Sequence, residues 1–113
     1  MEIVPNPEGG IAYKCASGEQ VTMRFVNHNT DLRVSYQFED EGAAESVTGN
    51  SMTFTMTKPL RVLRVFFHFV NEAGTGGSYD ATLSGSDGGT FPDPPPVRQV
   101  GDSVPSRRYA FIS

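Results

Sequence analysis

Hydrophobic and polar residues alternate along most of this chain. In the clearest stretch, residues 31–39, Leu32, Val34, Tyr36 and Phe38 share one face and polar side chains share the other. A period of two predicts a half-buried β-strand. The same pattern predicts further strands, whose apolar positions are Ile11, Tyr13 and Cys15; Val21, Met23 and Phe25; Met52, Phe54 and Met56; Tyr79, Ala81 and Leu83; and Tyr109 and Phe111.

The segment 60–70 differs from these strands because both of its faces carry apolar bulk. Val65, Phe67 and Phe69 point one way, while Phe66, His68 and Val70 point the other. A strand that is apolar on both faces is usually central and covered on both sides. Near residue 62 the alternation is irregular, which predicts a β-bulge. Something must then cover the Phe66 face: the Pro-rich tail, a second copy of the chain, or a ligand.

About seven strands follow from this pattern, at the spacing of a small all-β domain. We predict a two-layer antiparallel β-sandwich, with a small β-barrel as the alternative. Residues 1–113 form a single domain, because 113 residues support one core. The chain has 12 Gly and 8 Pro, which lie between the predicted strands and gather in an irregular segment at 85–106.

Neighbouring strands are predicted to pair as hairpins. A four-residue loop at 28–31 places Phe25 opposite Val34 and keeps both apolar sets on one face. A second hairpin, between 64–70 and 79–84, places His68 opposite Asp80. The Pro-rich run at 92–96 is predicted to form a lid over Phe66, and a docking segment is the alternative.

Charge and composition exclude several classes of function. The formal net charge is −4, so the chain lacks the basic field that nucleic-acid binding requires. No apolar run approaches the ~20 residues of a membrane span. The N-terminus has no signal-peptide pattern, which predicts a cytoplasmic protein and leaves a secreted location open. The single cysteine, Cys15, excludes an internal disulfide and is expected to be a small buried residue.

No catalytic signature is present, and we predict a protein that is not an enzyme and holds no cofactor or metal. His68 with Asp80 could orient a general base, but no nucleophile elbow accompanies them, so an exposed cross-strand pair is preferred. A small hydrolase resting on this pair is the last alternative. The carboxylates near 71–77 and 85–89 lack calcium-loop spacing and are interpreted as turn residues. Arg24, Arg33 and Arg64 would form an arginine-bearing face if their strands were neighbours.

The preferred function is a recognition module that binds a protein or surface ligand through loops or an exposed sheet face. The alternatives are a glycan-binding, lectin-like domain and a structural subunit that forms a homo-oligomer through strand 64–70. The partner is therefore a protein or a glycan, with no nucleic acid and no membrane span. The candidate binding residues are Arg64, Phe66, His68, Val70, Asn71, Glu72, Asp80 and Asp87.

Overall fold

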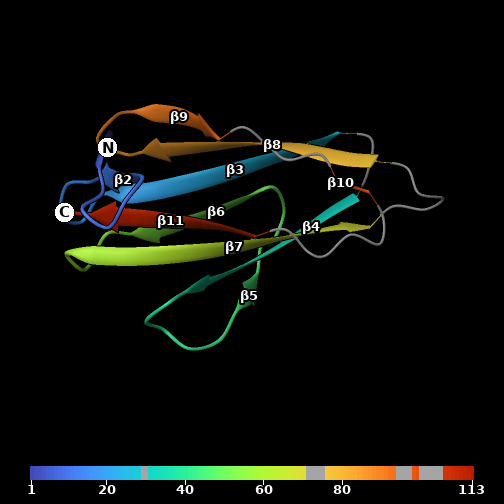
Figure 1. Cartoon of the computed structure of the whole chain (residues 1–113), viewed down its shortest axis with the longest axis horizontal. Coiled ribbons are helices and arrows are strands. Elements are labelled where there is room, and N and C mark those ends of the chain that lie inside the picture. Colours follow the sequence, from blue (N-terminus) through green and yellow to red (C-terminus); the bar gives the residue numbers. More distant parts are fainter. Residues whose placement is uncertain (29–30, 71–75, 94–97, 100–105) are drawn as a thin grey trace.

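The chain folds into two β-sheets, shown in the computed structural model of Figure 1. The structure describes residues 1–28, 31–70, 76–93, 98–99 and 106–113. These residues contain strands and turns but no helix. Their strands are β1 (Glu2–Pro5), β2 (Ile11–Lys14), β3 (Gln20–His28), β4 (Asp31–Phe38), β5 (Glu45–Ser46), β6 (Ser51–Thr55), β7 (Leu60–Val70), β8 (Gly76–Gly85), β9 (Thr90–Asp93), β10 (Arg98–Gln99) and β11 (Ser106–Ile112).

The two sheets have separate strand orders. The six-stranded sheet runs β1-β2-β11-β7-β4-β5, and the five-stranded sheet runs β10-β8-β3-β6, with β9 also paired to β8. This confirms an all-β chain with two sheets and excludes the closed barrel. The predicted count of seven strands is not confirmed, since the described residues form eleven. One pair, β11 with β2, is parallel, so the sheets are not wholly antiparallel.

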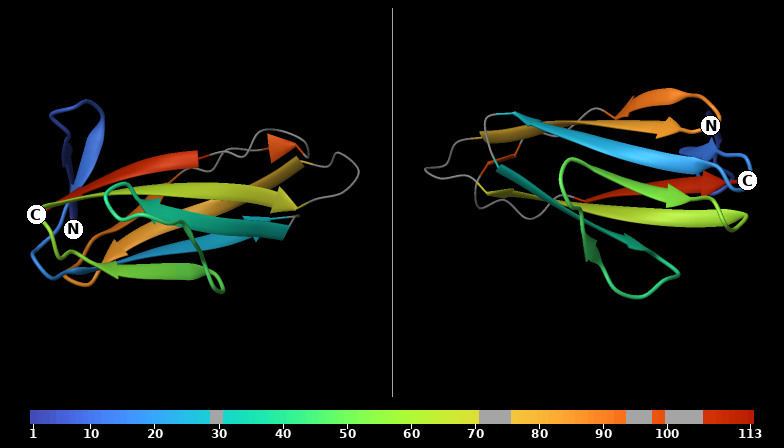
Figure 2. Two further views of the ribbon diagram at one scale, coloured as in Figure 1. Left: turned by 90° about the horizontal axis from the view of Figure 1, so that it is seen from below. Right: turned by 180° about the vertical axis from the view of Figure 1, so that it is seen from behind.

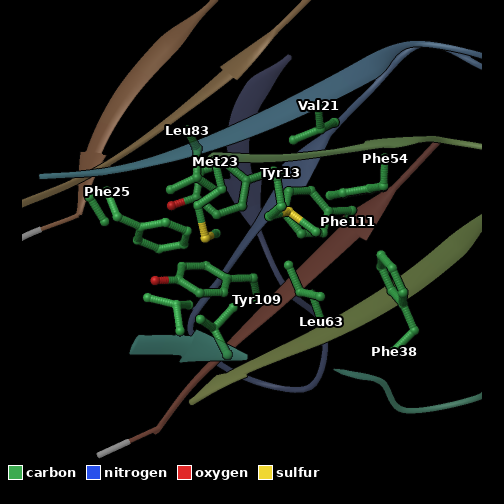
Figure 3. Packing of buried hydrophobic residues seen from close by; sticks show 14 of the residues in the cluster. Tyr13, Val21, Met23, Phe25, Phe38, Phe54, Leu63, Leu83, Tyr109 and Phe111 are labelled. Carbon is green, nitrogen blue, oxygen red and sulfur yellow. The ribbon is translucent and has the colours of Figure 1, made fainter. Parts of the chain in front are cut away.

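The core lies between the two sheets. Figure 3 shows side chains from both sheets pointing toward one another, with Phe25 and Met23 on one side and Tyr109 and Leu63 on the other. The Phe25 ring meets the ring of the fully buried Phe67 edge-on, with centroids 5.8 Å apart. The alternation therefore predicted the inward residues correctly on most strands. Ile11 is the exception, because it is 54% exposed near one edge of its sheet.

Strand β7 contains no bulge, although one was predicted near residue 62. Its register with β4 and with β11 is uninterrupted. The alternation looked irregular because the inward position before Leu63 is taken by Arg61, which is buried at 7% exposure. The Arg61 guanidinium carbon lies 3.7 Å from the centre of the Phe38 ring, so a charged residue occupies an apolar position by stacking.

The predicted hairpin between β3 and β4 is wrong. Strand β3 pairs with β6 and β8, whereas β4 pairs with β5 and β7. Phe25 and Val34 therefore lie in different sheets and face the core from opposite sides. Two strands of a hairpin must have their apolar side chains on the same face of the sheet. Two strands that face each other across a core also bury their apolar faces against one another, so the same alternation fits both arrangements. The alternation cannot distinguish these two arrangements.

The predicted pairing of β7 with β8 is wrong for the same reason. His68 lies opposite Arg33 of β4, and Asp80 lies opposite Val26 of β3. The segment 85–106 is not wholly irregular, because it contains β9 and β10. Phe91 of β9 packs against the core beside Tyr13, with ring centroids 5.9 Å apart, and β9 belongs to the five-stranded sheet. The described part of the predicted lid therefore does not cover Phe66, and residues 94–97 lie outside the described residues.

Candidate functional site

The outward-facing side of the six-stranded sheet gathers several of the predicted binding residues. Its three central strands, β11, β7 and β4, lie side by side (Figure 2, left). Along β7 the even-numbered residues face outward because their odd-numbered neighbours are buried in the core. We call this surface the outer sheet face; its central residues are Arg33, Ser35 and Gln37 of β4, Leu60, Val62, Arg64, Phe66 and His68 of β7, and Ser106, Arg108, Ala110 and Ile112 of β11.

Two arginines of this face lie directly opposite each other. Arg64 and Arg108 are partners in the register of β7 and β11, and like charges in this position repel. Glu39, just after β4, bridges them. Its carboxylate accepts two hydrogen bonds from Arg108, at 2.7 and 3.3 Å, and lies 3.5 Å from Arg64 Nη2. The hydrogen bond from Arg108 is the main reason that the pKa of Glu39 is lowered, so this carboxylate is charged at neutral pH.

Farther along the face, Arg33 lies opposite His68, and both side chains are exposed. Arg33 has no ion-pair partner among the described residues. Between these two residues and the Arg64–Glu39 bridge lies Phe66, which is partly exposed and flanked in register by Ser35 on β4. The Phe66 ring thus lies between Arg33, which has no ion-pair partner among the described residues, and Arg64, which shares the Glu39 carboxylate with Arg108.

An apolar groove of about 450 Å³ adjoins Arg108 at the other end of the face. Val62, Ala110 and Ile112 form its floor, and the turn between β1 and β2 contributes residues 6–8 to its wall. That turn is held by a hydrogen bond from the Asn6 N–H to the Gly10 carbonyl, 3.0 Å, and Gly10 has a φ of +72°. Leu60 also lines the groove and is 53% exposed, so an apolar surface is accessible beside the arginines.

The other predicted binding residues are not all brought to this face. Val70 ends β7, while Asn71 and Glu72 lie outside the described residues. Asp80 belongs to β8 in the five-stranded sheet. Asp87 lies in the turn after β8.

A buried carboxylate forms a separate polar cluster near the N-terminus. Glu19 Oε2 lies 3.1 Å from the Met1 ammonium, and Glu19 Oε1 accepts a hydrogen bond from the Ala16 N–H at 2.9 Å. Burial opposes ionisation of Glu19, but these bonds and one from the Asp87 N–H outweigh it and lower the pKa of the carboxyl. Burial, together with the Glu19 charge, raises the pKa of Cys15 to about 11, so its thiol stays protonated at neutral pH.

The described residues contain no group of three or more His, Cys, Asp or Glu side chains placed to hold a metal ion. In that part of the chain, no helix has the length and apolar character needed to cross a membrane. In comparisons with known proteins, no family model matches the sequence, and no curated protein or solved structure shows significant similarity to it.

Sequence reasoning placed Arg33 and Arg64 on outward faces but did not predict that Glu39 bridges Arg64 and Arg108, or that a groove lies beside them. Arg24, the third predicted member of an arginine face, lies on β3 in the other sheet. The signal for Arg108 was its alternation with Tyr109 in the last strand. Its significance depends on β11 lying beside β7, which joins residues far apart in the sequence.

Proposed function

We propose that this protein is a non-enzymatic recognition module whose outer sheet face binds an acidic segment of a partner protein. The proposal rests on one observation: Arg33, Arg64 and Arg108 lie on the same face of the six-stranded sheet, although the net charge of the chain is −4. Three arginines against the carboxylates of Glu39 and Glu8, the second of which lies near Arg108 and lines the same groove, leave a local charge of about +1. Such a surface attracts carboxylates and repels cationic partners.

The apolar parts of the same face favour a peptide over a free anion. Phe66 is partly exposed between the charged groups, and the groove beside Arg108 has room for an apolar side chain. Guanidinium groups bind carboxylates through paired hydrogen bonds, and an adjacent apolar contact adds affinity. An extended segment in which acidic and apolar residues alternate would meet both kinds of surface.

A labelled peptide with alternating Glu and Leu tests this proposal by fluorescence anisotropy. The intact chain should bind it, and Arg33→Glu should weaken binding about tenfold because it changes the local charge from about +1 to about −1. Arg24→Glu is the matched control, since Arg24 is an exposed arginine on the other sheet. Added salt should weaken binding, because exposed charges are screened beyond ~8 Å at physiological ionic strength.

Two results would contradict the proposal. One is an equal loss of affinity in Arg24→Glu and Arg33→Glu, which would indicate nonspecific attraction by net charge. The other is equally tight binding of a peptide in which Lys replaces Glu. Mapping the peptide by amide chemical shifts should place the largest changes at Arg33, Phe66 and Arg108, and changes confined to β3 and β8 would also contradict it.

A further inference from the structure

Strand β6 forms one edge of the five-stranded sheet, and nothing in its sequence protects that edge. Among the described residues it pairs with β3 alone, and Figure 2 (right) shows it as the last strand on that side. Edge strands usually avoid association by carrying charges, Pro or bulges, or by being very short. Residues 51–55 read Ser-Met-Thr-Phe-Thr, without charge or Pro, and the register with β3 is uninterrupted.

The other sheet edges of the described residues do carry such protection. Strand β1 contains Glu2 and Pro5, and β9 contains Pro92. Strands β5 and β10 are each two residues long. Strand β6 is therefore the exception among these edges, which indicates that its free side pairs with a strand of another molecule.

The hydrogen-bonding groups on the free side of β6 can be assigned from the ladder. The Phe25 N–H donates to the Asn50 carbonyl at 2.7 Å, and pairs that exchange hydrogen bonds alternate with pairs that do not. The backbone groups of Ser51, Thr53 and Thr55 therefore point away from β3. The Thr55 carbonyl confirms this direction, because it accepts a hydrogen bond from the Arg61 side chain at 2.9 Å.

We infer that β6 pairs antiparallel with β6 of a second copy, forming a symmetric dimer with one sheet running through both chains. A twofold axis at Thr53 places Thr53 opposite its own copy and Ser51 opposite Thr55. The Thr55 carbonyl already accepts the Arg61 hydrogen bond, so it would accept the Ser51 N–H of the second copy through its other lone pair. The outward side chains at these positions are hydroxyls, and Thr–Thr and Thr–Ser pairs stabilise adjacent strands. No like charges meet across the axis, since β6 carries none.

Sedimentation velocity over a concentration series tests the dimer directly. The intact chain should change from monomer to dimer as its concentration rises through the micromolar range. Thr53→Lys should remain monomeric, because two ammonium groups would then meet at the twofold axis. Thr90→Lys is the matched control and should still dimerise, since Thr90 is an exposed threonine on β9, at the opposite side of the same sheet.

A cysteine substitution supplies a second readout. Thr53→Cys should form an intermolecular disulfide under mild oxidation, because paired strands bring these Cα atoms to ~5.5 Å. Thr90→Cys should not, and the buried Cys15 does not compete. A chain that stays monomeric throughout the series overturns the inference, and so does a dimer that Thr53→Lys leaves intact. These results are independent of peptide binding, because the outer sheet face belongs to the other sheet.

Discussion

The buried Arg61 makes a prediction about stability that can be worked out from its contacts. Its guanidinium stacks on Phe38 at 3.7 Å and on Phe54 at 5.3 Å, a geometry worth ~2 kcal/mol when it is shielded from water. Its Nη1 donates to the Thr55 carbonyl at 2.9 Å, a charged hydrogen bond worth about 1.5–3 kcal/mol. Its ion pair with Glu41 adds only about 0.5 kcal/mol, since Glu41 is 40% exposed.

Against these contributions, Arg61 Nε is buried and has no hydrogen-bond partner, which costs ~1 kcal/mol. We therefore expect Arg61→Ala to lower the free energy of unfolding by roughly 3–4.5 kcal/mol. Urea unfolding followed by far-UV circular dichroism should show a midpoint lower by about 2–3 M, for an m value of about 1.5 kcal/mol/M. Arg61→Met should lose about half as much, because it keeps the apolar stem and removes the unpaired nitrogen.

Arg24→Ala is the control for Arg61→Ala, since Arg24 is exposed on an outward strand face. It should change the unfolding free energy by less than ~0.5 kcal/mol. If Arg61→Ala lowers the midpoint no more than Arg24→Ala does, the stacked arginine is not a stabilising element and the reasoning is refuted. A change in m value would instead show that the substitution alters the denatured state.

Two further predictions follow from the core and from the N-terminal cluster. Phe67→Ala should lower the unfolding free energy by ~3–5 kcal/mol, because Phe67 is fully buried. Phe66→Ala should lower it by less than half as much, because Phe66 lies on the opposite, partly exposed face of the same strand. Equal losses of unfolding free energy in urea melts would contradict this orientation of the sheet. Because the pKa of Glu19 is lowered in the folded chain from its ordinary 4.5, its stabilising contribution is complete above that value and is lost as pH falls below it. The difference in unfolding free energy between the intact chain and Glu19→Gln should therefore be largest at neutral pH and shrink in acid. A difference that grows in acid would contradict a lowered pKa for Glu19 in the folded chain.

The strand that carries Phe66 shows which property a local hydrophobic pattern predicts and which it leaves open. This strand was expected to be central because both faces carry apolar residues, and β7 does lie between β4 and β11. The predicted homo-oligomer through strand 64–70 would use the outward face of that strand, and it stays a prediction. Among the described residues, β6 pairs on one side only, although its alternation resembles that of the other strands.

The sequence by itself determined the all-β class, most of the strand positions and the inward residue at nearly every position. These properties are local, because successive side chains on a strand point to opposite faces and burial selects the apolar set. Cys15, expected to be a small buried residue, is buried beside Tyr13 in the core.

Only the tertiary structure decided which strands are neighbours. Two strands with matching apolar faces can pair edge to edge or face each other across a core, and both arrangements bury the same side chains. The choice between them placed β3 and β4 in different sheets, separated His68 from Asp80, and brought Arg108 beside Arg64. The arginine face depends on that choice, because Arg64 and Arg108, which lie opposite each other, are more than forty positions apart in the sequence.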